Sequence, residues 1–208
     1  MIFPATGLYA ITQTDGKTNP DIIEDVNAAL KGGARVIQYR DKRSTDKVSL
    51  AKQLLSLCKQ FNVPLLINDD AELACQIGAD GVHIGKNDGS VVTARNLLGP
   101  KAIIGVSCYD DIDIALQAQR DGVDYVAFGR FFPSNSKPLA LPAHTETLQL
   151  AKKQIKLPIV AIGGILPENG HTLLTAGADV LAVIGGVFDN DPERSAKTYS
   201  KLFNNPSN

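Results

Sequence analysis

Short aliphatic runs alternate along the chain with longer segments in which apolar residues recur every three or four positions. Such runs are typical of strands buried on both faces, and the longer spacing, as in residues 21–31 and 47–61, predicts amphipathic helices. Eight strands are expected, near residues 8–12, 34–40, 64–69, 81–85, 102–107, 125–130, 158–163 and 180–185. Strict alternation of aliphatic strands and helices predicts a parallel sheet, and eight such units predict an α/β fold, a closed (β/α)8 TIM barrel.

A repeated phrase supports this count. The phrase begins with glycine, which in most copies is followed by alanine or valine and then by aspartate. It ends a helical segment and precedes every second strand, at residues 33–36, 78–82, 122–126 and 177–180. Glycine suits the position after a helix because a positive φ costs it little. Three of the remaining strands follow a proline, which stops the preceding helix. An open doubly wound sheet is the alternative, but the eight regular units and the lack of an early glycine-rich fingerprint favour one compact barrel domain over residues 1–208.

Composition narrows the class of protein. The apolar share of 44% and the charged share of 21% are typical of globular domains, and a net charge of −1 provides no field that would attract nucleic acid or a membrane. Three cysteines without paired spacing argue against a disulfide framework or a zinc site and for a reducing compartment. Neither a signal peptide nor a membrane span is apparent. We expect a cytoplasmic protein, and the sequence leaves open whether it forms a homo-oligomer.

The stretch Leu-Leu-Ile-Asn-Asp-Asp at residues 65–70 indicates where a site is expected. Three aliphatic residues lead directly to Asn68, Asp69 and Asp70. Carboxylates lose free energy on leaving water unless something binds them, so this strand is either aimed at a site or followed by an aspartate that only caps the next helix. Taken alone, the stretch supports both interpretations equally. The ends of the other strands decide between them, because a barrel of this kind carries its active site there.

Cations and a second carboxylate follow neighbouring strands. Gln38 and Arg40 are two positions apart and are expected to face the same way, Lys42 is close to them, and Lys137 comes from a loop rich in hydroxyl groups and proline. Asp88 follows the strand next to that of Asp69, and two carboxylates with phosphate oxygens are a typical Mg²⁺ environment. Each residue alone could be an ordinary solvated side chain. Together they predict a rim that binds Mg²⁺ and a diphosphate.

The last two strands end in glycine pairs, Gly163-Gly164 and Gly185-Gly186. As adjacent pairs before helices, they predict backbone amides that grip a phosphate, although each pair alone would more often be a turn. His83 lies inside an aliphatic strand and is expected to be packed and hydrogen-bonded rather than catalytic. The other two histidines, including His144, have no acidic or cysteine partner nearby in the sequence. No nucleophile elbow, Walker loop or paired-cysteine motif is present.

Six short motifs, in this order, resemble the thiamine phosphate synthase family and its relative, the thiazole tautomerase TenI. The resemblance covers about residues 8–189. The motifs are Gln38-Tyr-Arg40-Asp-Lys42, Asn68-Asp69-Asp70, Ala79-Asp-Gly-Val-His83-Ile-Gly85 with Asp88, Gly105-Val-Ser107, Pro133-Ser-Asn-Ser-Lys137 and Ala161-Ile-Gly163-Gly164-Ile165.

The resemblance implies a transferase that joins 4-amino-2-methyl-5-hydroxymethylpyrimidine diphosphate to 4-methyl-5-(2-hydroxyethyl)thiazole phosphate, with Mg²⁺ assisting a dissociative loss of pyrophosphate. It also implies a role for each matching residue. Gln38 would position the pyrimidine, and Asp69 and Asp88 would bind Mg²⁺. The diphosphate would be held by Arg40, Lys42, Asn68 and Lys137, with Ser107 close by. The thiazole phosphate would be received by Ser134, Ser136, Gly164, Ile184, Gly185 and Gly186.

The sequence departs from the family pattern mainly on the thiazole side. Ser134 and Ser136 replace threonines, and Gly185-Gly186 replaces a common Ser-Ala, which removes one side-chain phosphate donor. Two other functions stay open. The first is a TenI-like tautomerase, whose histidine belongs in the loop after the sixth strand, where this chain has Arg-Phe-Phe at residues 130–132. The second is a non-catalytic sensor of a phosphate ligand.

Overall fold

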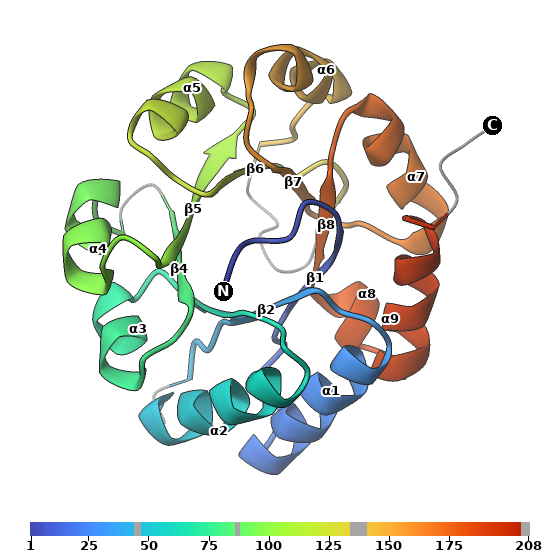
Figure 1. Ribbon diagram of the computed structural model, residues 1–208. Helices are drawn as coiled ribbons and strands as arrows, with labels where there is room; N and C mark the ends of the chain where they lie inside the picture. Colours follow the sequence, from blue (N-terminus) through green and yellow to red (C-terminus); the bar gives the residue numbers. More distant parts are fainter. Residues whose placement is uncertain (44–46, 86–87, 134–140, 205–208) are drawn as a thin grey trace.

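Eight parallel strands close into a barrel in the computed structural model, which describes residues 1–43, 47–85, 88–133 and 141–204. Each strand pairs with the next along the chain, and the last pairs with the first. Helices form a ring outside the barrel (Figure 1). The strands are β1 (Gly7–Ile11), β2 (Val36–Tyr39), β3 (Leu65–Asn68), β4 (Gly81–Ile84), β5 (Ile103–Tyr109), β6 (Tyr125–Phe128), β7 (Ile159–Ile162) and β8 (Val180–Val183).

The helices follow the strands in alternation, with two after the last one. They are α1 (Asn19–Lys31), α2 (Lys47–Gln60), α3 (Ala71–Ile77), α4 (Val91–Leu98), α5 (Ile112–Arg120), α6 (Thr145–Gln154), α7 (Pro167–Ala176), α8 (Gly185–Phe188) and α9 (Pro192–Lys201). The predicted barrel and its eight strands are confirmed, with strand ends shifted by no more than two residues. No helix among the described residues is long and apolar enough to cross a membrane.

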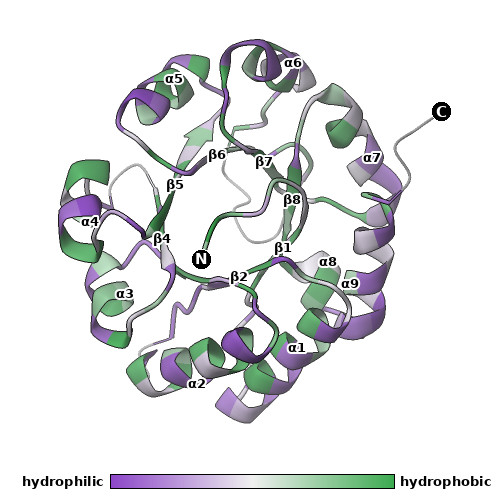
Figure 2. Ribbon diagram, viewed as in Figure 1, coloured by the Kyte–Doolittle hydropathy of each residue, from purple (hydrophilic) through white to green (hydrophobic). Residues whose placement is uncertain are grey.

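The period-two alternation of the strands divides the core into two layers. In β1, Leu8 and Ala10 pack outward against the helices, whereas Tyr9 and Ile11 point into the barrel. The outer layer is the larger one and lies between the strands and the apolar sides of the helices. Figure 2 shows hydrophobic and hydrophilic residues alternating along the helices of the ring, as amphipathic helices require.

The aspartate of the glycine repeat has a structural role that recurs around the barrel. In three of the four copies, its carboxylate accepts a hydrogen bond from a backbone amide at the start of the preceding strand. The pairs are Asp80 with the amide of Leu65 (3.0 Å), Asp124 with that of Ile104 (2.8 Å) and Asp179 with that of Ile159 (3.0 Å). The repeat therefore satisfies buried amides that lie at the amino ends of the strands.

We expect Asp80→Ala to lower the free energy of unfolding by about 1–3 kcal/mol, because the amide of the fully buried Leu65 loses its acceptor. Urea denaturation measures this difference. Glu24→Ala, at an exposed position of α1, is the control and should change stability by less than about 0.5 kcal/mol. Equal free energies of unfolding for the two variants would show that the hydrogen bond from the Leu65 amide to Asp80 does not stabilise the fold.

Candidate active site

A pocket of about 740 Å³ opens at the carboxyl ends of β2, β3 and β4. Five residues that the sequence singled out as site residues border it: Arg40, Lys42, Asn68, Asp69 and Asp88. They come from three segments that are far apart along the chain. Barrel closure brings them together, because the carboxyl ends of all eight parallel strands meet at one rim.

The two aspartates that follow β3 have different surroundings. Asp70 is the N-cap of α3, and its carboxylate accepts a hydrogen bond from the amide of Leu73 at 2.8 Å. Asp69 has a left-handed backbone with φ of 65°, and its amide donates to the carbonyl oxygen of His83 at 2.8 Å. Asn68 Nδ2 donates to Asp69 Oδ2 at 2.5 Å. The capping interpretation therefore holds for Asp70, and Asp69 lies exposed at the pocket.

Gly85 shows how closely the carboxylates of Asp69 and Asp88 approach each other. A Cβ atom at Gly85 would overlap Asp88 Oδ2 and would lie 3.6 Å from Asp69 Oδ1. Only a glycine at the end of β4 leaves this space to the two carboxylates. Among the described residues, no group of three or more His, Cys, Asp or Glu side chains could hold a metal ion. Two carboxylates do suit Mg²⁺, which keeps several water ligands and binds substrate phosphates.

The cationic side of the pocket is fixed through a threonine that the sequence reasoning missed. Thr12, which follows β1 and is only 2% exposed, accepts from the amide of Arg40 through Oγ1 and donates to its carbonyl oxygen, both at 2.9 Å. The neighbouring Asp41 forms an ion pair with Arg43, in which Arg43 Nη2 lies 2.7 Å from Asp41 Oδ2. Burial acts to raise the pKa of Asp41, but hydrogen bonds from Arg43 and Tyr39 lower it to about 2. Arg40 and Lys42 both border the pocket, and among the described residues neither has an ion-pair partner, so their charge is available to a ligand there.

Gln38 and Ser107 lie inside the barrel rather than at the pocket. Gln38 is 2% exposed, and its Nε2 donates to the hydroxyl oxygen of Tyr9 at 2.6 Å. Ser107 Oγ lies 2.9 Å from His83 Nε2, and His83 Nδ1 lies 2.8 Å from the hydroxyl of Tyr125. The prediction that His83 is packed and hydrogen-bonded is confirmed. The two tyrosines were missed, and the only signal in the sequence was an aromatic residue with a polar end inside an aliphatic strand.

The glycine pairs after β7 and β8 both lie in tight surroundings. Gly163 and Gly164 have φ of 104° and 63°, and a Cβ atom at Gly164 would overlap the carbonyl oxygen of Pro133. Ile184 precedes α8, which starts at Gly185, and a Cβ atom at Gly186 would overlap the hydroxyl of Tyr199. Close packing therefore explains glycine at these positions, and phosphate binding by their amides stays a prediction. Ser134, Ser136 and Lys137 lie outside the described residues.

A family model, curated relatives and a solved structure of more than 30% identity point to one family. The family model described as thiamine monophosphate synthase matches residues 8–187. A thiamine-phosphate synthase of Nitrosococcus oceani is 50% identical over 200 residues, which cover 95% of this chain and 92% of that protein. One of Marinobacter nauticus is 50% identical over 202 residues, with 95% and 90% covered. The solved structure of a thiamine phosphate pyrophosphorylase from Pyrococcus furiosus is 32% identical, superimposes with a TM-score of 0.87 and covers 96% of both chains.

His144 has an acidic partner, which corrects the expectation from the sequence. Asp110, which directly follows β5, accepts hydrogen bonds from His144 Nδ1 (2.6 Å), from the His144 amide (3.0 Å) and from Thr147 Oγ1 (2.6 Å). The partner lies 34 residues earlier, so a search of nearby positions did not find it. The hydrogen bond with Asp110 raises the pKa of His144, and the contacts hold the start of α6 against the end of β5.

We expect the pKa of His144 to lie above its ordinary value of 6.5 and to fall towards that value in Asp110→Asn. Because the pKa is raised in the folded state, the pair's contribution to stability is complete below pH 6.5 and is lost as the pH rises through the folded-state pKa. A pH titration followed by NMR measures this value. A His144 pKa in Asp110→Asn equal to that of the wild type would refute the pairing.

Proposed function

The chain belongs to the thiamine monophosphate synthase family, and we propose that its carboxyl rim is the active site of a thiamine-phosphate synthase. The enzyme joins 4-amino-2-methyl-5-hydroxymethylpyrimidine diphosphate to 4-methyl-5-(2-hydroxyethyl)thiazole phosphate, and the products are thiamine phosphate and pyrophosphate. One observation supports this location above all others. The residues that border a single pocket include two cations, an amide and two carboxylates from three strand ends, which is the donor set that a diphosphate with its counter-ion needs.

The cations suit the chemistry of the leaving group. An aminopyrimidine stabilises a cation at its exocyclic methylene, so the bond to the diphosphate oxygen can break before the thiazole nitrogen attacks. Negative charge then accumulates on the departing pyrophosphate. A fixed cation about 4 Å away is worth roughly 4 kcal/mol at an effective dielectric constant near 20. Since each 1.4 kcal/mol is about a tenfold change in rate, Arg40 and Lys42 can supply much of the stabilisation without a covalent nucleophile.

Asp69 and Asp88 are proposed to hold Mg²⁺. Their carboxylates meet above Gly85, and the pocket leaves room for phosphate oxygens and water as further ligands. The Asn68 amide donates to Asp69 Oδ2, and the other oxygen, Oδ1, lies 3.6 Å from the Cβ position at Gly85 that Asp88 Oδ2 also borders. When bound, the metal ion supplies charge neutralisation to the diphosphate.

The remaining predicted site residues complete the proposal. Gln38 receives the pyrimidine from inside the barrel, and Ser107 on β5 is assigned to the diphosphate. The thiazole phosphate is assigned to Ser134, Ser136, Gly164 and the Ile184–Gly186 turn, and Lys137 is assigned to the diphosphate. These assignments follow from the family resemblance. No observation on the described residues favours the tautomerase or the sensor over the transferase.

Asp69→Asn tests the proposed metal site. We expect kcat/KM for thiamine phosphate formation to fall at least about 100-fold, because an amide provides no negative charge for the metal ion. The Mg²⁺ concentration for half-maximal activity should also rise. Steady-state kinetics across a Mg²⁺ series measures both quantities.

Asp70→Asn is the matched control, since it lies one residue away and asparagine caps helices as well as aspartate does. Its activity and its Mg²⁺ dependence should stay within about threefold of the wild type. Asp69→Asn with the Mg²⁺ dependence of the wild type would contradict the assignment of this carboxylate to the metal.

A further inference from the structure

A chain of hydrogen bonds crosses the barrel interior from Gln38 to Ser107. Gln38 Nε2 bonds to the Tyr9 hydroxyl (2.6 Å), which bonds to the Tyr125 hydroxyl (2.9 Å). The Tyr125 hydroxyl then bonds to His83 Nδ1 (2.8 Å), and His83 Nε2 to Ser107 Oγ (2.9 Å). The five residues come from five different strands: β2, β1, β6, β4 and β5. No two of them are neighbours in sequence, so only the closed barrel assembles the chain.

The donor and acceptor in the first two hydrogen bonds, from Gln38 to Tyr9 and from Tyr9 to Tyr125, follow from the chemistry of the groups. The amide nitrogen of Gln38 can only donate, so the Tyr9 oxygen accepts from it. Among the described residues, the Tyr9 hydroxyl hydrogen-bonds only Gln38 and Tyr125. Tyr9 is 1% exposed, and leaving its hydrogen without an acceptor would cost about 1–3 kcal/mol. The hydrogen of Tyr9 is therefore donated to the oxygen of Tyr125.

The same reasoning continues to Ser107. Tyr125 is fully buried and accepts from Tyr9, so its own hydrogen goes to His83 Nδ1. His83 then carries its proton on Nε2 and donates it to Ser107 Oγ. Burial raises the pKa of both tyrosines, which keeps them protonated as the chain requires. The hydrogen of Ser107 is thus left for donation to a ligand.

If every hydrogen bond of the chain ran in the opposite direction, each buried group would again have a partner. An arrangement in which only some of the bonds are reversed does not have this property. If Gln38 turned its Oε1 towards Tyr9, Tyr9 would donate to Gln38, Tyr125 to Tyr9 and His83 Nδ1 to Tyr125. Ser107 would then donate to His83 Nε2 and could only accept from a ligand. Any mixed arrangement leaves a buried hydroxyl or a ring nitrogen unsatisfied. The chain therefore has two states, each of which is set as a whole.

We propose that this chain couples the two ends of the substrate site: the orientation of the Gln38 amide determines whether the Ser107 hydroxyl can donate to a ligand or can only accept from it. Tyr9, Tyr125 and His83 are positioning residues in this scheme. The inference rests on the proposed function. The exocyclic amino group of the aminopyrimidine would donate to Gln38 Oε1 and hold Nε2 towards Tyr9. Ser107 would then be a donor to an anionic oxygen of the diphosphate.

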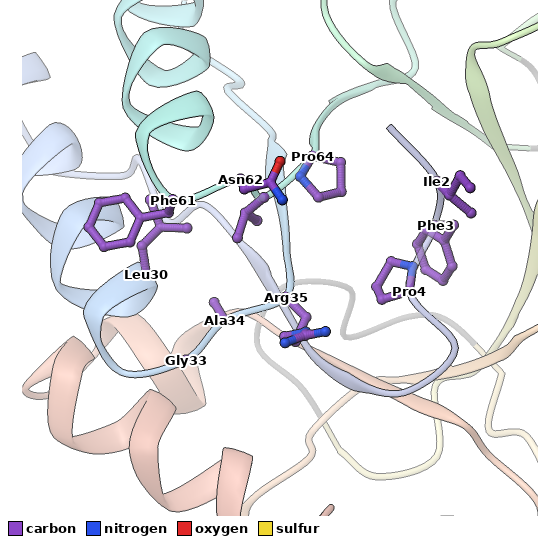
Figure 3. A pocket seen from close by; sticks show the side chains of 11 residues that line it. Ile2, Phe3, Pro4, Leu30, Gly33, Ala34, Arg35, Phe61, Asn62 and Pro64 are labelled. Atoms are coloured by element: carbon purple, nitrogen blue, oxygen red, sulfur yellow. The ribbon is translucent and has the colours of Figure 1, made fainter.

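The packing around Tyr125 holds the centre of the chain in place. Phe3 stacks on its ring with centroids 4.0 Å apart and planes at 14°, and His83 stacks at 5.6 Å and 20°. A Cβ atom at Gly105 would overlap the Tyr125 ring, so glycine is required there. Figure 3 shows Phe3 beside Ile2 and Pro4 on a pocket of about 510 Å³ at the amino ends of the strands. The N-terminal segment thus supports Tyr125 from the end opposite the rim.

Nitrogen-15 NMR of the histidine side chains at pH 8 tests the coupling without substrate. In the wild type, His83 should be protonated on Nε2 and unprotonated on Nδ1. Gln38→Glu should reverse the direction of all the hydrogen bonds in the chain, because a carboxylate only accepts. His83 should then be protonated on Nδ1, although it does not contact position 38. The double variant Tyr9→Phe/Gln38→Glu interrupts the chain and should return His83 Nδ1 to the unprotonated form. The variants His144→Gln and His171→Gln identify the His83 signals.

An unprotonated His83 Nδ1 in folded Gln38→Glu would overturn the proposal, as would a protonated Nδ1 in the wild type. If Gln38→Glu does not fold, as judged by circular dichroism, Tyr125→Phe takes its place. Removing the donor to Nδ1 should raise the fraction of His83 protonated there, and an unchanged His83 would overturn the proposal. The signals require no turnover, so an inactive enzyme with the expected NMR response would refute only the proposed function.

Discussion

Closure of the parallel barrel is the constraint on which the other features depend. Eight strands paired in sequence order leave no free edge, and their carboxyl ends must all emerge on the same side. Asp69, Asp88 and Arg40, which follow three neighbouring strands, therefore meet at one rim. The amino ends must also be closed, and the repeated aspartates satisfy the strand amides there. One end of the barrel thus provides stability, whereas the other end is available for chemistry.

The barrel interior combines apolar packing with a network of buried polar groups. Its inward-facing side chains are mostly apolar, such as Phe3, Ile11 and Leu66, and a hydrogen-bonded chain of polar groups runs among them. Buried polar groups are tolerated when all of them have partners, and a chain of such groups transmits the orientation of one member to the next. In the proposed enzyme, the pyrimidine and its leaving group would meet the two ends of this chain.

Much of this architecture could be predicted from the sequence because it is encoded locally. The aliphatic runs, the prolines and the repeated glycines fix the number and order of the strands, and all four repeat glycines, such as Gly78 with φ of 68°, do have a positive φ. The choice between Asp69 and Asp70 as helix cap depends on backbone geometry, which composition does not reveal. The partnership of His144 with Asp110 and the link from Gln38 to Ser107 join distant residues, so only the folded chain shows them.

Release of pyrophosphate by the purified protein tests the central claim, that the carboxyl rim is a metal-assisted diphosphate site. The assay supplies the pyrimidine diphosphate and the thiazole phosphate together and separately, first with Mg²⁺ and then with EDTA. Our account predicts release only when both substrates and Mg²⁺ are present. Release that continues unchanged in EDTA would contradict the metal site, and no release under any of these conditions would contradict the transferase itself.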